Sequence, residues 1–347
     1  MSKRQTSGPE TAALRCPVCG GEGRFETEVR EQDAWLTSPD RFRLYACGAC
    51  GSRFIDTASL PHPLAHYYPG DYYGSRQQKY RGVFQRLSDA FRRWRFHVLF
   101  DRIGTEARRN SRGSSELPSV LDFGCGRGVM LGSFRENGWE ARGVEFSEQS
   151  AALVKAEYGV DVLHGPDAIE QLGGARFDLI TLFHVLEHLS DPRATVRKLA
   201  RHLRPGGRMV IEVPNYCRLQ RGLFGRWWWH LDPPRHLVHF TQKSLAAMLE
   251  KMGFRVRILA NFSVEYSFFC FLQSLMSLVT RRPNRLHVLI RSTPGADAPG
   301  PVESALTVLL AAVLAVPAAI GAIGAFFLAQ GDIIRVEALL PEGREIS

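Results

Sequence analysis

The chain has 347 residues, of which 45% are apolar and 23% are charged. These proportions are typical of a folded globular protein, and they exclude global disorder, a collagen-like repeat and a polytopic membrane protein. The net charge of +9 favours an acidic partner such as phosphate, anionic lipid or RNA, without choosing among them. The polar first ten residues lack the apolar stretch of a secretory signal, so we expect a cytoplasmic protein whose seven cysteines are thiols or metal ligands.

Changes of composition along the chain predict six regions. In order, we expect a disordered tail, a zinc-ribbon-like domain, a linker with a basic amphipathic helix, an α/β core, an apolar helical insertion, and a last strand with its tail. Their predicted bounds are 1–12, 13–60, 61–116, 117–262, 263–331 and 332–347.

Two C-x-x-C pairs stand in the N-terminal region. The pairs are Cys16 with Cys19 and Cys47 with Cys50, and a glycine follows the second cysteine of each pair. Four thiolates in such pairs are typical of a closed, tetrahedral and therefore structural Zn²⁺ site. The alternatives are two unrelated reduced pairs, or a redox role, which is disfavoured because it needs only one pair. The other cysteines are interpreted as packing residues or neutral thiols: Cys125, Cys217 and Cys270.

A glycine-rich turn follows an apolar, strand-like segment. The run from Asp122 to Gly128 reads D-F-G-C-G-R-G, and a helix-like segment comes next. Glycines at such a place let backbone N–H groups approach a ligand at a helix N-terminus. A second strand-like segment, 140–144, leads to Glu145, whose carboxylate can accept both ribose hydroxyls of a nucleoside. The spacing matches neither the dinucleotide fingerprint nor the phosphate loop, and Asp122 suits a cationic ligand better than a pyrophosphate.

The run 122–128 resembles motif I of class I S-adenosylmethionine-dependent methyltransferases, and the resemblance extends over the predicted core. Segments 177–183, 203–207 and 210–215 resemble the fourth strand, the following turn and the fifth strand of that family. The resemblance implies a Rossmann-like, seven-stranded α/β sheet and S-adenosylmethionine as cofactor. It assigns the ribose to Glu145 and adenine packing to Phe146. The cofactor-binding residues it implies are Asp122, Gly124, Cys125, Gly126, Gly128, Glu145, Phe146, Asp167, Ala168 and Phe183.

The segment after the predicted fourth strand contains His184, Glu187 and His188. Their spacing matches the H-x-x-E-H pattern of inverted zinc proteases. We reject a protease site because the pattern follows a buried strand and no third ligand is evident. In the family, this strand end faces the acceptor, so His184 is a candidate general base that Glu187 or His188 would orient. The alternative is that Glu187 and His188 form hydrogen bonds at the rim of the sheet.

Segment 226–241 combines three consecutive tryptophans, two prolines and three histidines. We interpret it as a binding loop over a cleft, because indoles suit sugar rings and amphipathic lipid headgroups. His236 is a second candidate base, and His239 is interpreted as structural. A general base would assist methyl transfer to a hydroxyl by removing its proton.

Residues 304–331 contain no charged side chain. As a helix, 304–330 would be roughly 40 Å long, more than the roughly 30 Å of a bilayer core. A second, shorter apolar segment covers 266–280. These patterns predict contact with a membrane, and the basic, aromatic segment 77–112 suits an anionic membrane surface or packs over the cofactor.

A single transmembrane helix conflicts with the predicted topology. Segments 255–262 and 332–339 resemble the sixth and seventh strands, so the chain between them must leave and return on one side of a membrane. Two spans would carry an arginine-rich linker across, against the positive-inside tendency. We therefore predict an in-plane or re-entrant hairpin with its turn near Pro317, Gly321 and Gly324. The alternative is a helical lid or a dimer interface.

The leading functional hypothesis is O-methylation of a saccharide, a lipid-linked glycan or a small metabolite at the cytosolic face of the inner membrane, as in polysaccharide biosynthesis. Sugar C-methylation is an alternative, because such enzymes resemble this arrangement of a four-cysteine domain before the core. RNA methylation is disfavoured because no Asn/Asp-Pro-Pro-aromatic motif follows the fourth strand, so nucleic acid is not the expected partner. A non-catalytic, cofactor-binding membrane scaffold is disfavoured by the intact run 122–128 and Glu145.

Overall fold

The computed structural model describes residues 14–30, 39–68, 82–110, 117–216, 218–263, 266–291, 299–341 and 343. The predicted tail 1–12 and Cys217 lie outside the described residues.

A seven-stranded sheet forms the centre of the protein, in the order β11-β12-β9-β8-β5-β6-β7. Five strands are parallel, and β12 is antiparallel to both of its neighbours. This arrangement confirms the predicted fold class, including the sixth and seventh strands. The central strand β5 is buried at every position, as expected for a parallel strand covered on both faces. The strands are β5 (Ser119–Phe123), β6 (Glu140–Glu145), β7 (Asp161–His164), β8 (Phe177–Phe183), β9 (Leu203–Pro214), β11 (Arg255–Ala260) and β12 (Ile333–Leu339).

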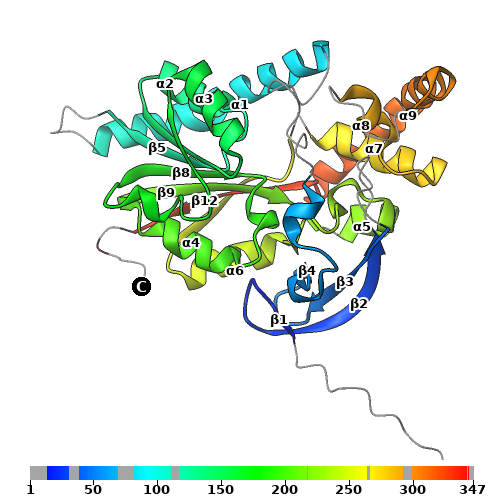
Figure 1. Ribbon diagram of the computed structural model, residues 1–347, viewed down its shortest axis with the longest axis horizontal. Helices are drawn as coiled ribbons and strands as arrows, with labels where there is room; N and C mark the ends of the chain where they lie inside the picture. The colour runs from blue at the N-terminus through cyan, green and yellow to red at the C-terminus, as the bar shows by residue number, and fades with distance from the viewer. Residues whose placement is uncertain are drawn as a thin grey trace, which may run out of the picture.

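Helices cover both faces of this sheet (Figure 1). The helices α1 (Gly82–Asn110), α2 (Val129–Glu136) and α3 (Glu148–Tyr158) lie on one face, and α4 (Pro192–Ala200) and α6 (Gln242–Lys251) lie on the other. Short polar side chains begin several of them: Ser147 caps α3, Asp191 caps α4, and Thr241 forms a capping box with Ser244 on α6. The 3-10 turns of the core are η4 (Glu170–Leu172) and η5 (Leu186–His188).

Helix α1 serves as a cover for the cofactor half of the sheet. Its residues Phe96 and Phe100 are buried against Phe134 of α2, with ring centroids 4.9 and 4.7 Å apart. The opposite face of α1 exposes Phe84 and Trp94. The helix therefore packs against α2 of the core and also presents exposed aromatic side chains. That it covers the cofactor stays a prediction.

The N-terminal domain forms a second, antiparallel sheet in the order β1-β2-β3-β4-β10. Its own strands are β1 (Leu14–Arg15), β2 (Glu22–Arg30), β3 (Arg41–Cys47) and β4 (Arg53–Ile55), followed by the 3-10 turns η1 (Thr57–Ser59) and η2 (Leu64–Tyr67). The fifth strand, β10 (Val238–His239), comes from the loop between β9 and α6 of the core. The N-terminal domain and the core thus share one sheet.

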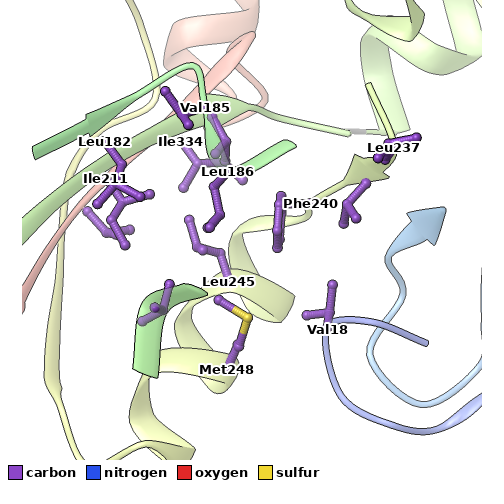
Figure 2. Packing of buried hydrophobic residues seen from close by; sticks show 14 of the residues in the cluster. Val18, Leu182, Val185, Leu186, Ile211, Leu237, Phe240, Leu245, Met248 and Ile334 are labelled. Atoms are coloured by element: carbon purple, nitrogen blue, oxygen red, sulfur yellow. The ribbon is translucent and has the colours of Figure 1, made fainter. Parts of the chain in front are cut away.

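The two parts also share one hydrophobic cluster. Val18, from the turn of the first cysteine pair, belongs to the same cluster as Phe240 after β10 and Met248 of α6. Figure 2 shows this cluster reaching Leu186 and Ile334 beside the central sheet. This buried contact holds the N-terminal domain against α6 and the segment before it.

The insertion before the last strand is helical, as predicted. It contains α7 (Ser267–Thr280), α8 (Arg285–Ile290) and α9 (Pro301–Phe327), and α7 packs against α9. Figure 1 shows these helices projecting together from one end of the core. Gly321 permits the close approach, because a Cβ atom there would lie 2.3 Å from the ring of Phe271.

The predicted turn near Pro317, Gly321 and Gly324 is wrong. α9 continues through Pro317 as one helix, and the reversal of direction lies between α7 and α9. A proline removes one backbone donor, but the uninterrupted apolar run and its packing on α7 keep the helix together. Among the described helices, α9 has the length and the apolar composition to cross a bilayer, and 17% of its most apolar stretch is buried against the rest of the protein.

Candidate active site

The four paired cysteines come together at one point. One sulfur atom from each lies within 4.8 Å of the other three, with Sγ of Cys16 and Cys50 3.7 Å apart and Sγ of Cys19 and Cys47 3.4 Å apart. Thiolates on one tetrahedral Zn²⁺ are separated by ~3.8 Å, given a Zn–S length of about 2.3 Å. The cluster therefore fits the structural zinc that the spacing predicts.

The glycine-rich turn lies at the carboxyl end of β5. The N–H groups of Gly124 and Cys125 both donate to the carbonyl oxygen of Val144, at 2.8 and 3.1 Å, so the turn is fastened to the neighbouring strand β6. Below the turn, the hydroxyl of Thr181 donates to Oδ1 of Asp122 at 2.7 Å. Asp122 is buried, and the structure places it under the turn as the motif predicts.

The three glycines of the turn adopt left-handed backbone angles, with φ of 77°, 54° and 70° at Gly124, Gly126 and Gly128. A Cβ atom at Gly124 would meet Val185, and one at Gly128 would meet Val154. A Cβ atom at Gly126 would meet no described atom within 4 Å. The middle glycine therefore borders open space where a ligand can approach the backbone.

Glu145 ends β6 beside that open space. Its carboxylate accepts the N–H of Gly126 at 2.7 Å and the N–H groups of Phe146 and Ser147 at 2.8 and 3.2 Å. Burial raises the pKa of Glu145, while these three backbone donors lower it. The side chain is thus held in one orientation next to the turn.

The remaining cofactor candidates lie at or after the carboxyl ends of β6, β7 and β8. The ring of Phe146 is 52% exposed and packs edge-on against Phe123, 5.9 Å between centroids, so one aromatic face is available to a base. Asp167 is exposed and Ala168 is buried in the loop after β7. Phe183 is half-buried at the end of β8, with its ring 6.3 Å from that of Phe100. Their contacts with a cofactor stay predictions.

His184 lies directly after β8 and is held between two carboxylates. Its Nε2 is 3.0 Å from Oε1 of Glu212 and its Nδ1 is 3.3 Å from Oε1 of Glu187. Burial lowers the pKa of His184, but the bonds to Glu187 and Glu212 outweigh it and raise that pKa to about 9. At neutral pH the ring is therefore an imidazolium, which cannot accept a proton. The backbone φ of 55° at His184 also shows that the segment is not the helix that a zinc-protease pattern requires.

Glu187, His188 and His236 form a second polar group, in which one polar atom from each lies within 4.8 Å of the others. The rings of His188 and His236 are 4.8 Å apart. Burial is the main cause that lowers the pKa of His236, and burial together with the charge of His236 lowers the pKa of His188 to about 4. Burial raises the pKa of Glu187, but His184 and His188 lower it to about 2. The two histidines are therefore neutral and the carboxylate is charged at neutral pH.

The backbone fixes which nitrogen of His236 carries its proton. Nδ1 lies 2.8 Å from the carbonyl oxygen of His230, an acceptor only, so in the neutral ring Nδ1 donates and Nε2 keeps its lone pair. Nε2 is 4.0 Å from Oδ2 of Asp232. Asp232 is in turn bound by Arg235, whose charge lowers the pKa of that carboxyl. Of the two candidate bases, His236 has the protonation state that base catalysis needs.

The N-terminal domain contacts this group directly. The hydroxyl of Tyr68 is 3.0 Å from Nδ1 of His188, and Nη1 of Arg235 donates to the carbonyl oxygen of Tyr67 at 3.2 Å. The N–H of Ile55 donates to the carbonyl oxygen of Leu237 at 2.9 Å. Sequence reasoning missed Tyr68 and Glu212, because their partners are distant in the sequence. It also missed Asp232, although its partners Arg235 and His236 lie three and four residues away.

The tryptophans do not form an open binding loop. Trp228 is 1% exposed, and its indole N–H donates to Oε1 of Gln220 at 3.1 Å. Trp229 packs against Phe269 of α7 and His287 of α8. This segment folds as α5 (Arg218–Phe224), η6 (Gly225–Trp227) and η7 (Trp229–Leu231). The expectation of an open loop fails at Trp228, which is covered by Tyr216 and His239, and at Trp229, which is covered by the helices of the insertion.

Comparison with known proteins agrees with this geometry. Residues 91–258 match a family model described as a methyltransferase domain. A ubiquinone biosynthesis O-methyltransferase of Caulobacter vibrioides is 33% identical over 139 residues, covering 38% of this chain and 53% of that protein. Another, of Idiomarina loihiensis, is 38% identical over 102 residues, covering 28% of this chain and 42% of that protein.

A probable S-adenosylmethionine-dependent methyltransferase of Mycolicibacterium smegmatis is 32% identical over 141 residues, covering 40% of this chain and 52% of that protein. The chain thus spans about half the length of the curated relatives it matches.

Proposed function

Because the chain belongs to the class I S-adenosylmethionine-dependent methyltransferases, we propose that it transfers a methyl group to a hydroxyl of a membrane-associated acceptor. The observation that carries the proposal is the open backbone at Gly126 beside the fixed carboxylate of Glu145. A nucleoside would find there the carboxylate of Glu145, the half-buried backbone of Gly126 and the exposed part of the Phe146 ring.

These residues fit S-adenosylmethionine, which supplies an electrophilic methyl group on a positively charged sulfur. Asp122 and Glu145 bring negative charge to the turn, and the positive side chain of the turn, Arg127, is paired with Asp89 of α1 at 2.8 Å. Glu145 would hold the ribose and Phe146 would pack against the adenine. The protein contributes mainly the alignment of donor and acceptor.

The acceptor hydroxyl loses its proton to Nε2 of His236 in this proposal. Nδ1–H of the same ring is fixed by the carbonyl of His230, and Asp232 stabilises the positive charge that the ring acquires. His184 acts as a positioning residue: as an imidazolium it holds Glu187 and Glu212 in place. Two relatives are named as O-methyltransferases, which supports an oxygen as the atom that is methylated.

A membrane-associated acceptor is supported by the exposed face of α9. Large apolar side chains recur there at alternating spacings of four and three residues, which places them along one stripe of the helix. The exposed residues of this stripe are Val302, Leu306, Leu309, Val313, Val316, Ile320, Ile323 and Phe327. Two exposed arginines, Arg281 and Arg282, follow α7 at the far end of the hairpin. An apolar stripe next to positive charge suits the surface of an anionic bilayer better than a span across it.

Transfer of a labelled methyl group from S-adenosylmethionine to cell fractions tests the proposal. Purified protein is incubated separately with membrane lipids including lipid-linked glycans, with polysaccharide and with RNA, and the products are fragmented to identify the methylated atom. Label on an oxygen of a lipid or lipid-linked product supports the proposal. Label on RNA, on a sugar carbon, or in no fraction contradicts it. The Gly126→Arg variant is the control for label that does not depend on the cofactor site.

A further inference from the structure

Three metal-ligating side chains meet where the apolar insertion joins the core. His230 comes from η7, Cys270 from the first turn of α7, and Asp332 from the residue before β12. Their exposed fractions are 4%, 0% and 0%. One ligand atom from each lies within 4.8 Å of the other two. This group is separate from the paired cysteines and from the glycine-rich turn.

Two atoms of this group have no hydrogen-bond partner. Nε2 of His230 and Oδ2 of Asp332 are both buried without one, although they lie only 3.7 Å from each other. That separation is too long for a hydrogen bond. Leaving a buried carboxylate oxygen and a buried imidazole nitrogen unsatisfied is costly, so an arrangement of this kind indicates a missing partner.

A cation between the two atoms explains their separation. Zinc binds histidine nitrogen and carboxylate oxygen at about 2.0–2.2 Å, so two such ligands at a tetrahedral angle lie ~3.4 Å apart. The observed 3.7 Å is close to this value. Cys270 adds a sulfur to the nitrogen and the oxygen, and such a mixed donor set favours Zn²⁺ over Mg²⁺ or Ca²⁺, which prefer oxygen ligands.

The surroundings hold the carboxylate in place, as the second layer of a metal site does. The hydroxyl of Ser267 donates to the other oxygen of Asp332, Oδ1. The backbone N–H of Asn215 donates to the carbonyl oxygen of Asp332 at 2.8 Å, and the side-chain amide of Asn215 donates to Gly331 at 2.8 Å. Asp332 therefore keeps one oxygen directed at His230 and Cys270.

We propose that His230, Cys270 and Asp332 bind a second divalent cation of the zinc type, which fastens α7 to the methyltransferase core. The same residue His230 gives its carbonyl oxygen to Nδ1 of His236. Cation binding at this place would therefore also fix the loop that carries the acceptor base. The proposal does not depend on the identity of the acceptor.

Metal content measured by mass spectrometry on the purified full-length protein tests the site. Wild-type protein is expected to hold at least two zinc ions per chain, and Cys270→Ala and Asp332→Asn are each expected to hold one fewer. On cobalt substitution, the wild-type protein should show more thiolate-to-cobalt charge-transfer absorption than Cys270→Ala, because one sulfur ligand is lost.

Ser274→Ala is the matched control. The hydroxyl of Ser274, on the same helix, accepts the N–H of Trp229 at 2.9 Å, so its loss disturbs the same junction without removing a ligand. This variant should keep the wild-type metal content. A wild-type protein with a single zinc ion, or Cys270 and Asp332 variants with undiminished metal, overturns the proposal, and the wild-type measurement decides even if a variant does not fold.

Discussion

Nδ1 of His236 lies 2.8 Å from the carbonyl oxygen of His230, and this contact leaves Nε2 as the proton acceptor of the ring. His230 lies in η7, and His236 lies in the loop that follows η7 and continues into β10. The fixed tautomer distinguishes His236 from His184, whose two nitrogens both face carboxylates.

Replacing His236 by Gln should lower kcat by about 10²–10⁴-fold, the usual contribution of a general base. The affinity for S-adenosylmethionine should stay unchanged, because His236 does not belong to the glycine-rich turn. Steady-state methyl transfer and calorimetry measure the two quantities. His202→Gln is the control, since His202 contacts the carbonyl oxygen of Ala175, away from this loop. Undiminished kcat in His236→Gln would exclude the base.

Replacing Gly126 by Arg should abolish cofactor binding. The side chain would occupy the open space that the middle glycine borders, and the left-handed φ of 54° would be strained for a residue with a Cβ atom. Calorimetry with S-adenosylmethionine measures the effect. Gly222→Arg is the matched control, because a Cβ atom there also meets no described atom within 4 Å but lies on α5. Equal affinity in the two variants would contradict the assignment of the site.

Loss of the zinc ion that we predict at the paired cysteines should loosen the loop that carries His236. β10 pairs with β4, so disorder in the zinc domain removes the partner strand of Val238 and His239. In a Cys47→Ser, Cys50→Ser variant, which leaves His230, Cys270 and Asp332 intact, amide exchange should accelerate in 237–240, while the central strands β5 and β8 stay protected. Hydrogen-exchange mass spectrometry makes the comparison. Unchanged protection of 237–240 would show that the zinc domain does not support the loop.

The ion pairs of His184 should make the free energy of unfolding depend on pH between about 6.5 and 9. The folded-state pKa of His184, about 9, exceeds its ordinary value of 6.5. The stabilisation from the charged ring is therefore fully present below pH 6.5 and is lost as the pH rises through about 9. Urea unfolding at several pH values should show this loss in the wild-type protein and not in His184→Gln. The His202→Gln variant should retain the wild-type pH dependence, and a His184→Gln variant with the same dependence would refute the assignment.

A charge on the exposed stripe of α9 should weaken membrane binding. Wild-type protein should float with vesicles that contain an anionic phospholipid, and Val313→Glu should float less because a carboxylate would have to leave water. Phe25→Glu is the matched control: Phe25 of β2 is 58% exposed, comparable to 64% for Val313, but lies in the zinc domain. Wild-type protein that stays in solution as a dimer, without flotation, would identify the stripe as a contact between two copies.

The sequence patterns predicted the parts of the fold that depend on local order. Strand-like runs bounded by glycines predicted the position of the sheet. The paired cysteines predicted a cluster, and in the structure their four sulfur atoms lie within 4.8 Å of one another. The turn that we predicted at Pro317 is wrong, because packing of α9 on α7 overrides the tendency of proline to end a helix. The exposure of Trp229 was misjudged for the same reason, because the helices that cover it come from later in the chain.

The candidate site was predictable only in part. The glycine turn and Glu145 are close in sequence and form a motif, so their positions could be inferred. The protonation of His184 depends on Glu212, 28 residues later, and the contact of His188 with Tyr68 spans 120 residues. Such pairings are fixed by the tertiary structure, and no periodicity or spacing encodes them.

Because of the two-residue strand β10, the folded unit is larger than the segment that matches the family model. The family match begins at residue 91, yet the strand that pairs with β10 lies at Arg53–Ile55. A chimera joined at the family boundary would carry the cofactor turn intact and leave the backbone of Val238 and His239 without its partner strand. Domain exchange between relatives of this protein should therefore be planned around the shared sheet, with the N-terminal domain and the loop 226–241 transferred together.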